Sequence, residues 1–239
     1  MPRLQSTRHK QSIGASMFTF FDTETTGLPD YNADLIDPKQ PRVLQFAALL
    51  VDAEGNEVSA FKCPIKPDGW EVDERLEVNG RKTAFAIHGL TNDYLNKYGV
   101  SMKTALIMFR MFQNQSELKI AHNYRFDGFL LKGEHARLGM DAGPDIEKFC
   151  TMKAITEIMK LPITEIMKLP PTDKMKSAGF SWPKSANLGE AYKFCTGKTH
   201  EKAHDALADV KAAKEVFFWI RNNGLFKDQP RSAPKTVEA

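Results

Sequence analysis

The sequence has few cysteines and no long apolar run. The three cysteines, at positions 63, 150 and 195, have spacings that suit neither a disulfide framework nor a zinc site, so we predict reduced thiols in a cytoplasmic protein. The longest apolar run, Val43 to Val51, is far shorter than the roughly 20 residues that span a bilayer. We therefore expect no transmembrane helix and no membrane partner.

A strong net charge and a targeting segment are also lacking. The net charge of +3 permits a surface for polyanions but does not require one. Residues 1–16 carry basic side chains without the apolar region of a signal peptide, and we expect them to form a flexible extension. Residues 227–239 are polar and predict a disordered tail. The remaining residues, 17–226, are enough for one domain with a full core.

Hydrophobic patterns predict strands first and then alternating helices and strands. Short β-prone runs at 17–21, 43–51 and 57–64 indicate an antiparallel meander. A helix is expected from an N-cap at Ser101, followed by a strand at 118–121. Two further helices are predicted from apolar stripes, one beginning near Phe126 and one containing Leu207 to Ile220. This order is typical of an α/β fold with a mixed sheet flanked by helices.

One segment departs from this regular pattern. The eight residues ITEIMKLP at 155–162 are repeated without change at 163–170. Eight residues are too short for the unit of a repeat protein, and Pro162 would break a helix that ran through both copies. We therefore predict a surface insertion with no functional role.

The strongest motif is DTETTGL at 22–28, where two carboxylates follow an apolar strand. Asp22 and Glu24 point to the same face of an extended chain, roughly 6.5 Å apart, and repel each other unless a cation lies between them. They are candidate ligands for a hard divalent ion. An aspartate at the end of a strand also commonly begins a turn. Gly27 allows a ligand to approach the backbone, and the hydroxyls of Thr25 and Thr26 are candidates to bind a sugar hydroxyl or a phosphate.

Two further motifs place acidic residues at the beginning of helices. In HNYRFD at 122–127, Asp127 enters the first turns of a helix, where the helix dipole alone would also favour a carboxylate. In HDALAD at 204–209, His204 and Asp209 differ by about 140° of helical rotation. Both can face one point only if His204 lies on the loop before the helix and Asp205 caps it.

Together these three motifs resemble the DEDDh subgroup of the DnaQ-like 3′→5′ exonuclease superfamily, over residues 17 to 224. The resemblance implies an RNase H-like fold, in agreement with the predicted layers. It also implies two Mg²⁺ or Mn²⁺ ions held by four acidic residues, with His204 as the base that deprotonates the attacking water. The implied ligands are Asp22, Glu24, Asp127 and Asp209.

Other residues are candidates for contact with the end of a nucleic acid. The stretch around His88 resembles the His-Gly turn that lines the nucleotide pocket in this superfamily, although a packed structural turn explains it equally well. Leu28 is expected to wedge or stack against the terminal base. Asn123 and Phe126 are weaker candidates for the same pocket.

The motifs favour a stand-alone or accessory exonuclease whose substrate is the 3′ end of single-stranded DNA. Association with a polymerase stays open. An exoribonuclease of the same superfamily would have the same reaction centre, because discrimination of the 2′-hydroxyl depends on pocket contacts. Two further hypotheses are a nucleic-acid-binding module without activity and an α/β domain with coincidental acidic residues.

Overall fold

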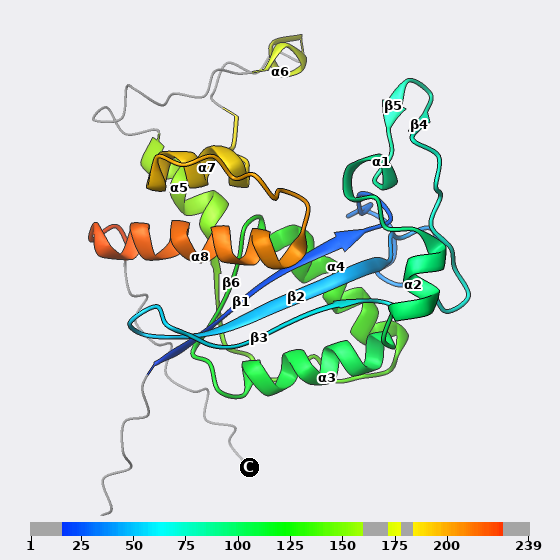
Figure 1. Cartoon of the computed structure of the whole chain (residues 1–239), viewed down its shortest axis with the longest axis horizontal. Helices are drawn as coiled ribbons and strands as arrows, with labels where there is room; N and C mark the ends of the chain where they lie inside the picture. Colours follow the sequence, from blue (N-terminus) through cyan, green and yellow to red (C-terminus); the bar gives the residue numbers. More distant parts are fainter. Residues whose placement is uncertain (1–15, 160–171, 178–183, 227–239) are drawn as a thin grey trace, which may run out of the picture.

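A five-stranded mixed sheet lies at the centre of the protein (Figure 1). The computed structural model describes residues 16–159, 172–177 and 184–226. The strands, in the sheet order β3-β2-β1-β6-β7, are Glu57–Pro64, Val43–Asp52, Met17–Thr25, Leu118–Ala121 and Glu147–Cys150. Strand β2 runs antiparallel to both of its neighbours, whereas β1, β6 and β7 are parallel. The predicted meander and the mixed α/β sheet are confirmed.

Helices cover both faces of this sheet (Figure 1). Helices α3 and α4 pack through one apolar cluster, and α8, α5 and α7 build two clusters on the other side. These five helices are Met102–Gln113, Tyr124–Arg137, Ala206–Asn222, Thr151–Met159 and Leu188–Thr196. The smaller elements are the hairpin β4 and β5 (Glu77–Val78 and Arg81–Lys82) and the short helices α1, α2 and α6 (Phe85–His88, Asn92–Tyr98 and Asp173–Ser177).

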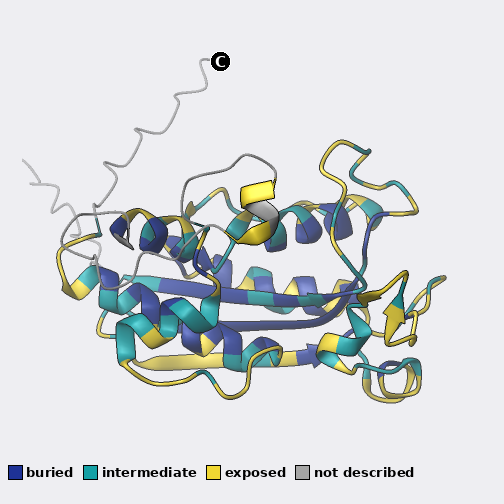
Figure 2. Cartoon of the chain, turned by 90° about the horizontal axis from the view of Figure 1, so that it is seen from above, coloured by how far each residue is buried: buried dark blue, intermediate teal, exposed yellow. Residues whose placement is uncertain are grey.

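Strand β1 supplies side chains to the cores on both faces of the sheet. Phe20 packs against Phe217 of α8 at 5.5 Å between ring centroids, whereas Phe21 packs against Phe109 of α3 at 5.1 Å. Both rings are fully buried, and the strands at the centre of the sheet are drawn mostly in dark blue, as buried, in Figure 2. Because side chains alternate along a strand, Asp22 and Glu24 point to the face that carries α8. The apolar part of β1 therefore fixes where its acidic end points.

The helices begin where capping residues occur in the sequence. Ser101 accepts a hydrogen bond from the Thr104 N–H at the start of α3, as predicted. Asp205 accepts one from the Ala208 N–H at the start of α8, which also agrees with the prediction. Between β6 and α4 the chain turns through Asn123, whose φ of 65° lies in the left-handed region that asparagine tolerates better than most residues. These turns place the first residues of α4 and α8 beside the carboxyl end of β1.

The prediction that the repeat is a surface insertion is wrong for the part that the structure describes. Ile155 to Met159, from the first copy, belong to α5, and Ile155 and Ile158 are 0% and 8% exposed in the core between α5, α7 and α8. Apolar side chains three residues apart lie on one face of a helix, and here that face is buried in the core. The second copy lies outside the described residues, as do the predicted terminal extension up to residue 15 and the tail at 227–239. No helix among the described residues combines the length and apolarity that a bilayer crossing requires.

Candidate active site

Four carboxylates from three separate parts of the chain meet at the carboxyl end of β1. Asp22 and Glu24 lie on β1, Asp127 in the first turn of α4 and Asp209 in the first turn of α8. The pKa of Asp22 is raised well above its usual value, first by burial and then by the charges of Asp127, Asp209 and Glu24. All four predicted acidic residues are thus close enough to repel one another.

Burial and neighbouring negative charges also raise the pKa values of two of the other carboxylates. Burial and then the charges of Asp209 and Asp127 raise the pKa of Glu24 to about 8. Burial raises the pKa of Asp127 to about 7, although hydrogen bonds from Thr23 oppose the shift. The cluster is therefore hard to ionise fully at neutral pH without a cation, which would remove the repulsion.

Asp127 is held in place by a residue of the first motif that the sequence did not single out. The backbone N–H and the hydroxyl of Thr23 both donate to Asp127 Oδ1, at 3.0 and 2.8 Å. Thr23 lies between Asp22 and Glu24 but points to the other face of β1, where α4 begins. Strand alternation alone could have shown that Thr23 faces away from Asp22, but not that Asp127 meets it there.

Asp209 is held by two histidines from the loop between α7 and α8. The backbone N–H of His204 donates to Oδ2 at 3.0 Å, and His200 Nε2 forms a short hydrogen bond with Oδ1. The His200 ring is nearly buried and lies 5.7 Å from the ring of Tyr192. No motif marked His200 in the sequence, because its role depends on how this loop folds back onto α8.

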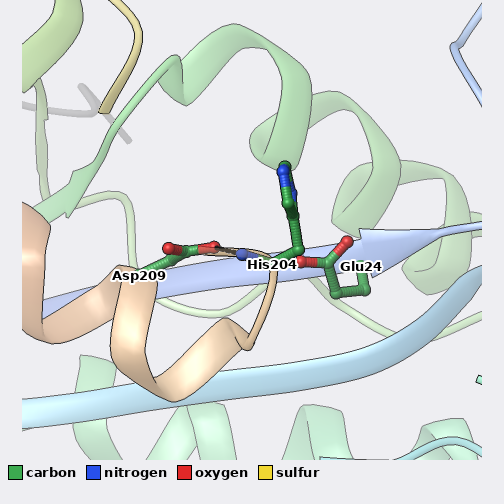
Figure 3. Close-up of side chains that lie close together, drawn as sticks. All are labelled: Glu24, His204 and Asp209. Carbon is green, nitrogen blue, oxygen red and sulfur yellow. Dashed lines mark hydrogen bonds between the residues drawn. The ribbon is translucent and has the colours of Figure 1, made fainter. Parts of the chain in front are cut away.

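His204 lies on the loop before α8, as predicted, and its side chain is exposed. Its φ of 70° is in the left-handed region, which is uncommon for residues other than glycine and places the ring beside Glu24 (Figure 3). Ligand atoms of Glu24, His204 and Asp209 all lie within 4.8 Å of one another. Carboxylate oxygens gathered this closely suit a hard divalent cation such as Mg²⁺ or Mn²⁺, so the residues present fit the implied metal site.

A cleft of about 700 Å³ opens beside the carboxylates. It is lined by the end of β1, the loop that follows, the β4–β5 hairpin, α1 and His204. Five of the residues predicted to contact substrate line it: Thr25, Thr26, Leu28, His88 and Phe126. The sixth, Asn123, is not among the lining residues and lies at the start of α4. The Leu28 side chain is 86% exposed, which leaves it free to meet a ligand.

Several polar groups of the cleft already have partners in the protein. The Thr25 hydroxyl donates to the Gly27 carbonyl at 2.8 Å, so its proton is not available to a ligand. The Thr26 hydroxyl accepts from the Arg42 N–H at 2.9 Å and keeps its own proton for another acceptor. His88 Nδ1 accepts from the Leu90 N–H at 3.0 Å, and burial is the main cause that lowers the His88 pKa. Neutral His88 therefore carries its proton on Nε2.

Most of the chain matches the model of a known protein family. The family model described as RNase T-type exonuclease matches residues 19–217. The chain belongs to this exonuclease family. The predicted relationship to DnaQ-like exonucleases is therefore confirmed, and the fold is the RNase H-like arrangement expected for it. No curated protein sequence matches this chain significantly.

Solved structures show the same fold at low sequence identity. Exonuclease I of Escherichia coli, in complex with a dA16 oligonucleotide, is 22% identical with a TM-score of 0.62, over 88% of this chain and 42% of that chain. Exonuclease I of Methylocaldum szegediense is also 22% identical, with a TM-score of 0.61, over 87% and 40%. The nuclease domain of 3′hExo, a DEDDh family member bound to rAMP, is 12% identical with a TM-score of 0.56, over 90% and 96%. The chain thus spans about two fifths of the Exonuclease I chains.

Proposed function

We propose that this protein is a 3′→5′ exonuclease of the DEDDh type that releases nucleoside monophosphates from the ends of single-stranded DNA. Two Mg²⁺ or Mn²⁺ ions would be held by the four carboxylates, and His204 would act as the general base. One observation carries this proposal: four acidic residues from three separate parts of the chain meet beside one cleft, and burial together with the charges of the cluster raises the pKa values of Asp22, Glu24 and Asp127. The carboxylates are Asp22, Glu24, Asp127 and Asp209.

The residues of the site have distinct tasks in this proposal. Divalent ions, when bound, make a hydroxide available at neutral pH and stabilise the oxygen of the leaving group. Thr23 orients Asp127, and the His204 N–H and His200 orient Asp209. A ring nitrogen of His204 takes the proton of the attacking water, a role that histidine fills more often than any other side chain. The exposed Leu28 packs against the terminal base.

The preference for DNA has support from one of the similar structures. Escherichia coli Exonuclease I was solved with a dA16 oligonucleotide. A 3′→5′ exoribonuclease is the second candidate, because the similar nuclease domain of 3′hExo was solved with rAMP. The three cysteines have no disulfide partner, which supports the proposed cytoplasmic location.

One assay tests both candidates. Oligonucleotides of matched sequence, as single- and double-stranded DNA and as RNA, carry a label at the 5′ end and are incubated with Mg²⁺, Mn²⁺ or EDTA. We expect a ladder of products shortened from the 3′ end on single-stranded DNA, and no cleavage with EDTA. Faster cleavage of RNA would favour the exoribonuclease. Binding without cleavage under all conditions would contradict the proposal and favour a non-catalytic binding module.

A further inference from the structure

We infer that the β4–β5 hairpin is a clamp for the phosphates of a single-stranded polynucleotide, on the side of the cleft opposite the carboxylates. The inference rests on the proposed function and adds an element that determines which substrates bind. The two cations of β5, Arg81 and Lys82, line the same cleft as Glu24 and His204. The strand would therefore lie with one phosphate at the carboxylates and its upstream phosphates at the hairpin.

The hairpin is built as a rigid arm. Its turn is formed by Asn79 and Gly80, with φ of 51° and 72°, and two such residues are typical of a type I′ turn whose twist matches the two strands. The end of the arm is held by Thr83, whose N–H donates to the Leu76 carbonyl and whose hydroxyl accepts from the Ala86 N–H of α1. Its cations are thus kept beside the cleft.

The chain leading into the hairpin is also fixed. Asn92, the first residue of α2, accepts from the Val72 N–H at 2.8 Å and donates to the Val72 carbonyl at 3.0 Å. Glu74 accepts from both the backbone N–H and the side-chain amide of Asn92, at 2.7 and 2.8 Å. One end of the arm is therefore anchored to α1, which lines the cleft, and the other to α2.

The charges on the arm suit a polyanion. Arg75, before the hairpin, forms an ion pair with Asp73. Arg81 and Lys82 are exposed and form no ion pair with any of the described residues. An arginine and a lysine without ion-pair partners bind phosphates without regard to base sequence.

The shape of the cleft favours an unpaired strand. The lining of the cleft includes the apolar side chains of Phe85, Phe126 and the exposed Leu28. Aromatic and apolar surfaces beside a basic track are typical of sites that bind single strands, because the faces of unpaired bases are free to stack. A base that is paired in a duplex keeps its stacking partners and gains little from these side chains.

Binding in the absence of catalysis tests the inference. The Arg81→Ala/Lys82→Ala variant is compared with wild type and with Lys132→Ala/Lys193→Ala, which removes two exposed cations from α4 and α7. Fluorescence anisotropy with a labelled 12-nucleotide single strand in EDTA gives the dissociation constant at several salt concentrations. We expect about 10-fold weaker binding for the hairpin variant only, with a salt slope smaller by about 0.7 for each lost phosphate contact.

A small substrate separates this result from the proposed function. The p-nitrophenyl ester of thymidine 5′-monophosphate has one phosphodiester and no upstream phosphate, so the hairpin variant should hydrolyse it at the wild-type rate with Mn²⁺. Equal binding of the 12-nucleotide strand by the hairpin variant and wild type would overturn the inference, as would equal losses in the hairpin and control variants. If wild type binds the strand through the hairpin but hydrolyses neither substrate, the proposed exonuclease activity fails while the clamp stands.

Discussion

At the scale of single residues, the site is arranged before any ligand arrives. Asp127 and Asp209 each receive two donors from neighbouring residues, so their carboxylates have fixed orientations. Such supporting hydrogen bonds around metal-binding carboxylates are commonly worth 10- to 100-fold in metal affinity or activity. The roles of His204 and His200 can be separated from each other by mutation.

His204→Ala should lower kcat by about 100-fold or more, the usual contribution of a general base. If His204 is a base rather than an ion ligand, the rise in melting temperature caused by Mn²⁺ should persist in this variant. Single-turnover assays on a labelled strand and thermal denaturation with and without Mn²⁺ measure the two effects. Turnover close to that of wild type would remove His204 from the reaction.

His200→Ala should raise the Mn²⁺ concentration needed for half-maximal activity by about 10-fold, because Asp209 loses the donor on Oδ1. His200→Gln keeps an N–H donor and should recover part of the loss. Activity measured over a range of Mn²⁺ concentrations compares the two variants. The same metal dependence in wild type and in His200→Ala would show that this contact does not position Asp209.

At the scale of elements, the start of α8 joins the sheet to the site. Asp205 caps the helix and pairs with Lys62 of β3 at 2.7 Å. The Ala206 N–H donates to Gln45 of β2, which lies opposite Glu24 in the sheet. The first turn of α8, which carries Asp209, is therefore fixed against two strands.

Asp205→Ala should destabilise the protein by about 1 kcal/mol, the usual cost of a lost N-cap. It should also lower activity, because the turn that carries Asp209 frays. Asp205→Asn keeps the cap and loses only the exposed ion pair with Lys62, so most of the stability should remain. Urea unfolding gives the free energies, and equal losses in both variants would contradict a capping role.

The elements with strong patterns were predicted from the sequence, and those that depend on tertiary contacts were not. Strands β1, β2, β3 and β6 and helices α3, α4 and α8 follow from apolar periodicity and caps such as Ser101. The β4–β5 hairpin has two-residue strands, and α1 has four residues, too few to show a period. In the same way the four carboxylates were predicted from motifs, whereas His200 was missed because only the folded loop brings it to Asp209.

At the scale of the whole molecule, folding gathers charges that repel one another. The sheet and the two layers of helices hold the four carboxylates together, and the energy of this arrangement comes from the surrounding cores. Like charges that repel one another make stability depend on pH and, under the proposed function, on metal. This dependence can be measured on the intact protein.

The metal-free protein should lose stability as the pH rises from about 4 to about 8. Unfolded Asp and Glu titrate near pH 4, whereas Asp127 and Glu24 in the folded protein have pKa values of about 7 and about 8. The folded state thus binds more protons in this range, and its advantage is present below pH 4 and lost as the pH passes 8. Melting temperatures in EDTA from pH 5 to 8.5 measure the effect.

Mn²⁺ should reverse this loss at high pH, because a bound cation favours the ionised carboxylates. The Glu24→Gln/Asp127→Asn variant serves as the control, since it lacks both titrating groups. Its melting temperature in EDTA should vary less with pH and should exceed that of wild type at pH 8.5. Parallel curves for the variant and wild type would contradict the coupling between these carboxylates.

The duplicated octapeptide has a consequence for how the length of this chain can vary. Ile155 and Ile158 pack in the core, and the second copy offers the same residue types, Ile163 and Ile166, eight positions later. Loss of either copy, for example by slippage when the gene is replicated, would leave an unchanged sequence to complete α5. Natural variants eight residues shorter should therefore keep the same buried contacts and tolerate the deletion.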